Sequence, residues 1–358
     1  MFETAETDKK KKMKTKYKVI ICLVSLFLAV LIIALIFFID FTKETLNYNY
    51  NEITEEPEEL GFEEIIEEKI INIALFGIDS RNLNSFKGLS DAIMILSINE
   101  KTKEIKVISI MRDTLVPIEY GGKTIYAKIN SAYSRGGPEL AIKTLNTLFS
   151  LDISEYATVN FYGMADIIDA VGGIEVELAE NEIGYELNYG IREVCTKMGI
   201  PYENYLINKS GKQTLNGIQA VSYSRMRYTS SIWGTSNDYG RTDRQRYIME
   251  QLFNKAINMD KSRYIPLAKA MIPCCETSLS FSEIIKTATS VLLSSPTFEQ
   301  ARVPMEEYQM TSKYINGVGS CVYYDLAYAG KIINAFIYDD IAPSDYIAQY
   351  GVEKNDWY

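Results

Sequence analysis

Arginine, without any lysine, is concentrated in residues 224–246, which read SRMRYTSSIWGTSNDYGRTDRQR. The chain as a whole is acidic, with a formal net charge of −10, and it uses lysine freely elsewhere. A guanidinium group offers a planar fork of donors that matches two phosphate oxygens at once, and it keeps its charge when water is excluded. This composition favours a phosphate-type anion site. The alternative is a set of surface ion pairs with Asp238, Asp243 and Glu250, each contributing roughly 0–1 kcal/mol. The arginines are Arg225, Arg227, Arg241, Arg244 and Arg246.

A helix is predicted to begin inside this segment. Thr242 and Gln245 have the spacing of a capping box, with Thr242 as the N-cap and Gln245 as the third helical residue. By helical spacing, Arg241, Arg244 and Gln245 lie on the same side as Ile248, which belongs to the core-facing stripe. A helix start already offers free N–H groups and a partial positive charge, so we expect the arginines to strengthen an anion site there.

Charged side chains also stand at the ends of predicted strands. Asp79 follows the apolar run INIALFG, Asp91 precedes AIMILSI, and Arg112 follows EIKVISIM. Ligand groups collect at strand ends in open α/β sheets, so Asp79 and Asp91 would converge if their strands are neighbours. Two carboxylates suit Mg²⁺, which binds through one or two carboxylates together with substrate phosphates. For each aspartate taken alone, capping of a local turn is the alternative.

Histidine does not occur in the sequence. Its absence excludes Ser-His-Asp and Cys-His catalysis, histidine zinc sites and a histidine general base. Acid–base or metal chemistry must therefore use carboxylates, hydroxyls or amines.

The strands that must position these residues are short apolar runs. They are predicted at residues 71–77, 92–98, 104–111, 157–161 and 174–178. The linker NEKTK between the second and third runs suits a hairpin. A hairpin among strands otherwise separated by helices predicts a mixed sheet rather than an all-parallel one.

Helical patterns alternate with these strands. One helix is predicted from Pro138, after Gly136-Gly137, with Ala141, Leu145 and Leu148 on one face. Two more are predicted over residues 162–171 and around residues 215–223. This alternation favours an α/β fold, a three-layer sandwich with a central mixed β-sheet flanked by helices.

A membrane-spanning helix is predicted near the start of the chain. Residues 19–39 form an uncharged run of 21 residues, and a bilayer core needs about 20. The run is too long for a signal peptide. The lysine-rich residues 1–18 should stay on the cytoplasmic side, so the chain is expected to be a single-pass protein of the cell membrane with its main part outside the cytoplasm. This topology leaves no role for nucleic acid.

An acidic stalk is expected over residues 40–69. Nine glutamates oppose Lys69 within residues 51–69, and like charges repel and extend such a segment. The catalytic domain is expected over residues 70–340, followed by a C-terminal tail over residues 341–358.

Of the five cysteines, Cys22 lies in the predicted membrane helix and the other four lie outside it. Disulfides can persist outside the cytoplasm. Four thiols allow three complete pairings, between which the sequence does not choose. Because Cys274 and Cys275 are adjacent, we expect one bridge from this pair to Cys195 or Cys321.

An ordered set of seven motifs over residues 70–255 resembles the LytR–CpsA–Psr family of membrane-anchored cell-wall enzymes. Met111 stands where the family more often has proline, and the four outer cysteines are not a family feature. The motifs are FGIDSR (76–81), SDAIMILSIN (90–99), ISIMRDT (108–114), KINSAYSRGGP (128–138), IDAVGGIEVEL (168–178), LNGIQAVSYSRMR (215–227) and DYGRTDRQR (238–246).

The resemblance implies a Mg²⁺-dependent phosphotransferase. Such enzymes move a glycopolymer from a polyprenyl-pyrophosphate carrier onto peptidoglycan, at the C6 hydroxyl of N-acetylmuramic acid, as a phosphodiester. The implied partners are the lipid-linked glycan, peptidoglycan and membrane lipid. The family's polyprenyl chain lies in an apolar tunnel between sheet and helices, whose lining residues the sequence does not identify.

The resemblance also implies roles for individual residues. Asp79 and Asp91 would bind Mg²⁺ on the pyrophosphate, and one of them would also serve as base toward the sugar hydroxyl. Arg81 and Lys128 would assist. The pyrophosphate would be held by Arg112, Arg225, Arg227, Arg241 and Gln245.

Two other functions stay open at the level of sequence. A pyrophosphatase acting on the same lipid, with water as acceptor, would use the same residues. A non-enzymatic regulator or lipid-binding scaffold of the cell envelope would not depend on Asp91. The glycopolymer (teichoic acid, capsule or another glycan) and the oligomeric state are not fixed by the sequence.

Overall fold

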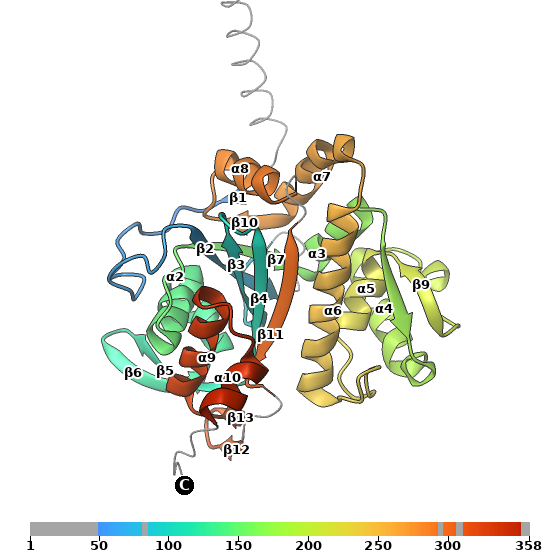
Figure 1. The fold of residues 1–358 in the computed structure, drawn as a ribbon. Helices are drawn as coiled ribbons and strands as arrows, with labels where there is room; N and C mark the ends of the chain where they lie inside the picture. The colour runs from blue at the N-terminus through green and yellow to red at the C-terminus, as the bar shows by residue number, and fades with distance from the viewer. Residues whose placement is uncertain (1–48, 81–84, 293–295, 306–310, 352–358) are drawn as a thin grey trace, which may run out of the picture. The chain divides into compact units, whose positions relative to one another are not determined.

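Seven strands form one mixed β-sheet in a computed structural model of the protein (Figure 1). The structure describes residues 49–80, 85–292, 296–305 and 311–351. Strand β2 runs parallel to β7, β4 runs parallel to β11, and β3 is antiparallel to both β2 and β4. In sheet order the strands are β1 (Asn49–Tyr50), β10 (Cys275–Thr277), β7 (Glu155–Asn160), β2 (Ile70–Ile78), β3 (Ser90–Asn99), β4 (Glu104–Ile110) and β11 (Thr297–Val303).

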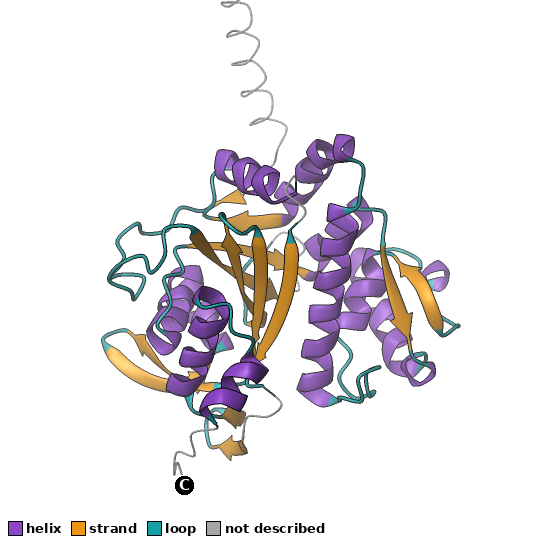
Figure 2. Ribbon diagram, in the orientation of Figure 1, coloured by secondary structure: helices purple, strands orange, loops and turns teal. Residues whose placement is uncertain are grey.

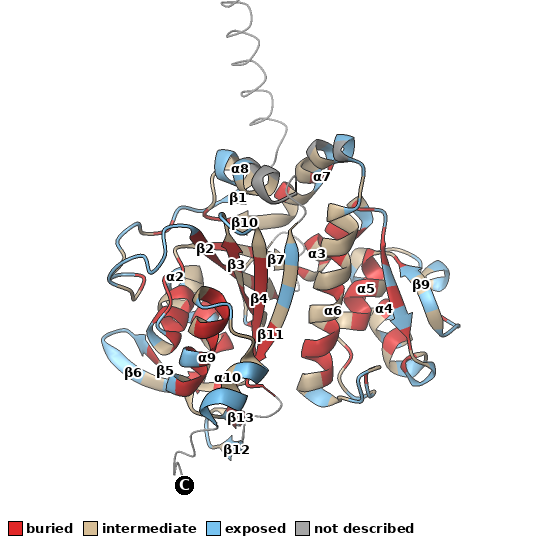
Figure 3. Cartoon of the chain, viewed as in Figure 1, coloured by how far each residue is buried: buried red, intermediate tan, exposed pale blue. Residues whose placement is uncertain are grey.

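The central strands β2, β3 and β4 form where the sequence has its apolar runs, and most of their residues are buried (Figure 3). The expected hairpin joins β3 to β4, with Met94 opposite Ser109 and Ile98 opposite Ile105. The mixed sheet predicted from that hairpin is therefore confirmed.

Helices α2 (Asn130–Phe149) and α9 (Leu326–Tyr338) cover one face of the sheet (Figure 2). Leu145 and Ile333 pack there against sheet residues such as Ile95. This core excludes water and supplies most of the favourable free energy that holds the helices on the sheet.

Helix α2 begins eight residues before the predicted start at Pro138. It continues across a kink at Gly136 and Gly137, which have non-helical backbone angles. Gly137 has a φ of 69°, a left-handed value that costs glycine little. The two glycines therefore bend one element instead of separating two.

The opposite face of the sheet looks toward α6 (Asn237–Ile257), where Phe253 stacks on Phe298 of β11 at 4.5 Å between ring centroids. A second core joins α6 to α3 (Phe161–Ala170), α4 (Tyr185–Met198) and α5 (Gly217–Ser224). The three-layer sandwich is thus confirmed.

The close packing of α5 on α3 explains why the motif LNGIQAVSYSRMR (215–227) has a glycine at position 217. A Cβ at this position would lie 2.0 Å from the carbonyl oxygen of Ala165, because α5 crosses α3 closely. A side chain would force the two helices apart and would displace Arg225, which caps the end of α5.

Strand β8 (Ile174–Leu178) has the predicted bounds, but it pairs with β9 (Gly211–Leu215) in a separate two-stranded sheet. Two other hairpins lie outside the central sheet. The remaining elements are β5 (Leu115–Tyr120), β6 (Lys123–Lys128), α7 (Tyr264–Met271), α8 (Phe281–Leu292), β12 (Thr311–Ile315), β13 (Gly319–Tyr323), α10 (Pro343–Tyr350) and four short 3₁₀ turns at Glu180–Glu182, Glu203–Tyr205, Lys261–Arg263 and Ile272–Cys274.

Residues 49–69 pack on the domain and differ in this respect from the expected extended stalk. Leu60 is buried in the main core, and the backbone N–H of Ile66 donates to Asp152 at 2.8 Å. A few apolar residues thus hold an acidic segment against the protein. At the other end, α10 packs on α9 within the expected tail.

None of the helices within the described ranges is long and apolar enough to cross a membrane. The predicted membrane segment 19–39, the basic residues 1–18 and residues 40–48 of the stalk lie outside those ranges.

The expected disulfide does not form. Cys195, Cys274, Cys275 and Cys321 are free thiols. Burial raises the pKa of Cys274 to about 11 and that of Cys275 to about 12, so these thiols stay protonated and unreactive near neutral pH.

Candidate active site

The carboxyl ends of β2, β4 and β7 and the start of β3 meet at one edge of the sheet. Asp79 directly follows β2 and is exposed. Asp91 is the second residue of β3, at an irregularity where Gly77 pairs with Ala92 and Ile78 with Ser90. The register therefore brings Asp79 and Asp91 to the same edge, on neighbouring strands.

Arg112 follows β4 at this edge and forms an ion pair with Asp91. Its Nε lies 3.7 Å from Asp238 and 3.8 Å from Asp113. Burial opposes its positive charge, but the carboxylates of Asp91, Asp238 and Asp113 outweigh this effect and raise the Arg112 pKa. Arg112 is therefore firmly cationic and held in place.

Arg241 projects from α6 toward the same group of charges. Its Nη2 lies 3.0 Å from Asp238, and the residue is only 3% exposed. Burial, together with the positive charges of Arg112 and Arg227, lowers the Arg241 pKa to about 10 against the opposing effect of Asp238. Among the described residues, its Nε and Nη1 find no hydrogen-bond partner.

These five residues, Asp91, Arg112, Arg227, Asp238 and Arg241, are called here the charged cluster. Buried hydrogen-bond donors are normally satisfied, and each one left unsatisfied costs about 1–3 kcal/mol. The Nε of Arg112 is also buried and makes no hydrogen bond within the described part of the chain, although two carboxylates lie 3.7 and 3.8 Å away. Within the described residues, the charged cluster thus holds three buried guanidinium donors, on Arg112 and Arg241, that could donate to an anion.

Arg225 and Arg227 stand at the start of the loop between α5 and α6, residues 225–236, called here the arginine loop. Arg225 lies over the ring of Phe161, 4.7 Å from its centroid, just after the end of β7. Its Nη1 is 3.5 Å from Glu193. Arg227 is partly exposed and close enough to Arg241 to lower the Arg241 pKa.

Lys128 lies beside the charged cluster, at the end of β6. Its Nζ is 2.9 Å from Asp113, which in turn lies beside Arg112. Gln245 is half-buried one helical turn after Arg241, on the same side of α6. The remaining candidate, Arg81, lies outside the described residues.

Arg244 has a different role from its neighbours. It is fully buried, with Nη2 2.8 Å from Glu182. It also donates to the carbonyl oxygens of Met226 at 3.2 Å and Thr229 at 2.8 Å. Arg244 therefore holds the arginine loop from beneath and offers no free donor to a ligand.

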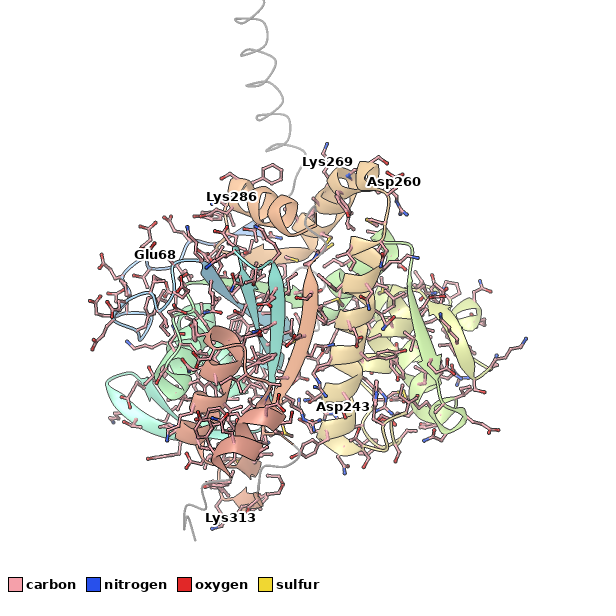
Figure 4. The ribbon with its side chains drawn as sticks, in the orientation of Figure 1. Glu68, Asp243, Asp260, Lys269, Lys286 and Lys313 are labelled. Carbon is pink, nitrogen blue, oxygen red and sulfur yellow. The ribbon has the colours of Figure 1, made fainter. Side chains whose placement is uncertain are left out.

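Arg246 also makes structural contacts. Asp243 accepts from Arg246 at 2.6 Å and from Arg302 of β11 at 2.7 Å, which fastens α6 to the sheet edge (Figure 4). Of the five arginines in the segment, Arg227 and Arg241 belong to the charged cluster, Arg225 contacts Phe161 and Glu193, and the other two make structural contacts.

The predicted capping box is wrong. Helix α6 begins at Asn237, five residues before Thr242, and Ser236 is its N-cap. The Thr242 hydroxyl donates instead to the carbonyl oxygen of Asp238 at 2.8 Å. Arg241 and Gln245 thus project from the second and third turns, where backbone N–H groups are already bonded.

Asp238, one of the ion-pair partners considered for the arginines, pairs with Arg241, which stands three residues later on the same helix face. The other acids that organise the site were not expected from the sequence. Glu182, Glu186 and Glu193 come from distant positions that carry no such local signal.

The carboxylates fit Mg²⁺ only in part. Among the described residues, no group of three or more Cys, Asp or Glu side chains is arranged to hold a metal. Asp79 makes no hydrogen bond or ion pair within that part of the chain, while Asp91 is shared with Arg112. Asp79 and Asp91 can serve a Mg²⁺ ion that takes its other ligands from a phosphate and water.

Comparison with known proteins supports the resemblance to the LytR–CpsA–Psr family that the sequence motifs indicated. A model of the LytR_cpsA_psr family matches residues 35–331. The chain is 29% identical over 283 residues to Biofilm regulatory protein A of Streptococcus mutans, covering 75% of this chain and 65% of that protein. It is 32% identical over 221 residues to the polyisoprenyl-teichoic acid–peptidoglycan teichoic acid transferase TagU of Enterococcus faecalis, covering 61% and 64%. The matches thus span just under two thirds of each relative.

Solved structures share the fold. Protein gbs0355 of Streptococcus agalactiae superposes with a TM-score of 0.61 at 24% identity, covering 86% of this chain and all of that one. The structure titled TagT bound to LIIa-WTA gives a TM-score of 0.59 at 20% identity, covering 80% and 99%. At these identities the likeness establishes the architecture alone.

Proposed function

Because the chain belongs to the LytR_cpsA_psr family, we propose that it transfers a glycopolymer from a polyprenyl-pyrophosphate carrier to peptidoglycan as a phosphodiester. The observation that carries this proposal is the group of three guanidinium ions from Arg112, Arg227 and Arg241. Asp91 pairs with Arg112 in this group, and Asp238 pairs with Arg241. The TagU relative is named for such a transfer.

The reaction balances as a phosphoryl substitution. An acceptor hydroxyl of peptidoglycan attacks the phosphorus that carries the glycan, the bond from this phosphorus to the bridging oxygen breaks, and polyprenyl phosphate leaves. Arg112, Arg227 and Arg241 would stabilise negative charge on the phosphate oxygens, which is the main requirement of such reactions. Asp79, which is exposed and unpaired within the described residues, would accept the hydroxyl proton.

We propose Mg²⁺ as the cofactor, held by Asp79 and Asp91 together with pyrophosphate oxygens. When bound, it would neutralise part of the pyrophosphate charge. Lys128, Arg225 and Gln245 would complete the binding of the anion from the rim of the charged cluster.

The second face of the sheet suits the lipid. Leu75, Leu96 and Phe298 are only partly buried there, whereas Ile93 and Ile95 on the first face are fully buried. Partly exposed apolar side chains under α6 would gain from contact with a polyprenyl chain. We propose that the chain runs along this face, and that the predicted membrane anchor at residues 19–39 keeps the domain outside the cytoplasm near its lipid substrate.

A transfer assay tests the function and separates it from the alternatives. Purified protein is given a polyprenyl-pyrophosphate-linked glycan, with and without peptidoglycan, and conjugate and released polyprenyl phosphate are measured. We expect conjugate only with acceptor, and at least a 10²-fold loss in Arg227→Ala because one charged donor to the phosphate is removed. Equal lipid cleavage with and without peptidoglycan would identify a pyrophosphatase. No cleavage under either condition would favour a non-enzymatic regulator. Arg192→Ala, which removes an arginine stacked on Tyr202, is the control.

Metal dependence is a separate prediction. Chelation of Mg²⁺ should reduce transfer by about 10²-fold or more, and Asp79→Asn should cause a loss of about 10²–10⁴-fold, since it removes both a ligand and the base. Asp339→Asn, at an exposed carboxylate after α9, should have no effect. Full activity of the wild-type protein in chelator would contradict the proposed cofactor.

A further inference from the structure

Helix α4 carries a pair of exposed aromatic rings that stack on each other. Tyr185 is 81% exposed and Tyr189 is 56% exposed. The two rings stack with centroids 5.5 Å apart and an interplanar angle of 24°. Aromatic side chains bury large apolar areas when they can, so a stacked pair left in solvent marks a contact surface.

The pair is fixed to the arginine loop. Glu186, next to Tyr185, accepts the backbone N–H groups of Arg227 at 2.6 Å, Tyr228 at 3.0 Å and Thr229 at 2.8 Å. Burial opposes the charge of Glu186, but these bonds outweigh it and lower the Glu186 pKa, so the carboxylate stays ionised.

A second contact connects α4 to the arginine loop two helical turns further along the helix. The Glu193 carboxylate lies 3.5 Å from Nη1 of Arg225, the first residue of the arginine loop. The helix that presents the tyrosines is therefore attached at two points to the residues that flank the candidate pyrophosphate site.

Tyr228 adds a third ring from the loop itself. It is 84% exposed and directly follows Arg227, and its own backbone is held by Glu186. Tyr185, Tyr189 and Tyr228 are called here the tyrosine platform. The platform is linked to the charged cluster through Arg227, which precedes Tyr228 in the chain and whose backbone N–H donates to Glu186, the neighbour of Tyr185.

We propose that the tyrosine platform binds sugar rings of the donor glycan, those nearest the pyrophosphate; this inference rests on the proposed function. A pyranose ring has an apolar C–H face and a rim of hydroxyls, and tyrosine matches it with an apolar ring and a polar tip. Because the donor glycan is bonded to the phosphate that Arg227 contacts, its first sugars must lie beside this loop. The acceptor glycan is free of that constraint.

Binding measurements on the full chain test the inference. The variant is Tyr185→Ala/Tyr189→Ala, and the control is Tyr126→Ala/Tyr314→Ala, which removes tyrosines that are 67% and 70% exposed on other elements. The ligands are bare polyprenyl pyrophosphate, the same lipid carrying four β-linked N-acetylglucosamine units, and a soluble peptidoglycan glycan fragment. We expect the variant to bind the sugar-bearing lipid about tenfold more weakly, from the usual strength of aromatic contacts, and the bare lipid as the wild type does.

Three results would overturn the inference. Unchanged affinity for the sugar-bearing lipid would show that the platform does not bind sugar. Weaker binding of the peptidoglycan fragment alone would assign the platform to the acceptor. Equal weakening for both lipids would mean that the tyrosines act through the loop structure. If the wild-type protein bound neither lipid, the result would instead contradict the proposed function.

Discussion

The Arg241→Ala variant is expected to lose transfer activity by about 10²–10³-fold, while its folded state is as stable as the wild type or more stable. Arg241 is almost fully buried, and its Nε and Nη1 have no partner among the described residues. Burial, with Arg112 and Arg227 nearby, lowers its pKa to about 10. Below that pH the charged guanidinium is less favourable in the folded chain than in water, so removing it relieves a cost.

The measurement is turnover of the lipid-linked glycan alongside urea unfolding of the same preparation. Arg246→Ala is the matched control, because it removes an arginine of the same helix that pairs with Asp243 outside the charged cluster. Its turnover should stay near that of the wild type. If Arg241→Ala unfolded more easily by several kcal/mol and kept its turnover, Arg241 would be a structural residue and the assignment of the cluster would be wrong.

A gain in stability on losing a charged residue is the pattern expected of a site built for a ligand. Like charges at Arg112, Arg227 and Arg241 are brought together by the fold and are only partly neutralised by Asp91 and Asp238. A bound pyrophosphate would supply the missing negative charge, and ligands that bind the folded state raise its stability.

The fold was predictable where local pattern decides it. The apolar runs that became β2, β3 and β4 are joined by a short hairpin, so their order and direction follow from the sequence. The same hairpin register sets Arg112 beside Asp91, which is why residues at predicted strand ends were sound candidates. The partners of β8 and β1 depend on pairings with distant segments, and periodicity carries no information about those.

Local sequence pattern also gave wrong predictions for two segments, the acidic residues 51–69 and the start of α6. Nine of the 19 residues in the segment 51–69 are glutamates, yet Ile53 and Leu60 are buried in the main core and the Ile66 N–H donates to Asp152, which holds the segment on the domain. The capping box failed because α6 begins at Asn237, so Thr242 lies inside the helix and its hydroxyl donates to the carbonyl oxygen of Asp238. The resemblance assigned the pyrophosphate to Arg225, Arg227 and Arg241 and left out Arg244 and Arg246. The structure gives the reason, because Arg244 pairs with Glu182, far away in the chain, and Arg246 pairs with Asp243.

Arg244→Met is expected to destabilise the folded protein by about 3–5 kcal/mol, the usual cost of leaving a buried charge unpaired. Glu182 is fully buried, and Arg244 at 2.8–2.9 Å is its ion-pair partner. The same change frees the carbonyl oxygens of Met226 and Thr229, so the arginine loop should loosen as well. The free energy of unfolding, measured in urea, checks the size of the effect.

A surface pair provides the scale for this prediction. Lys212 and Glu175 are 3.1 Å apart with both side chains largely exposed, so Lys212→Met should cost only about 0–1 kcal/mol. Glu182→Gln/Arg244→Met removes both buried charges and should recover part of the loss, because the penalty of the single variant comes mainly from the carboxylate left behind. Should Arg244→Met cost no more than Lys212→Met, the arginine loop would not depend on this pair. The orientation of Arg227 would then depend on the bonds that Glu186 accepts from the loop backbone, without the Glu182–Arg244 pair beneath the loop.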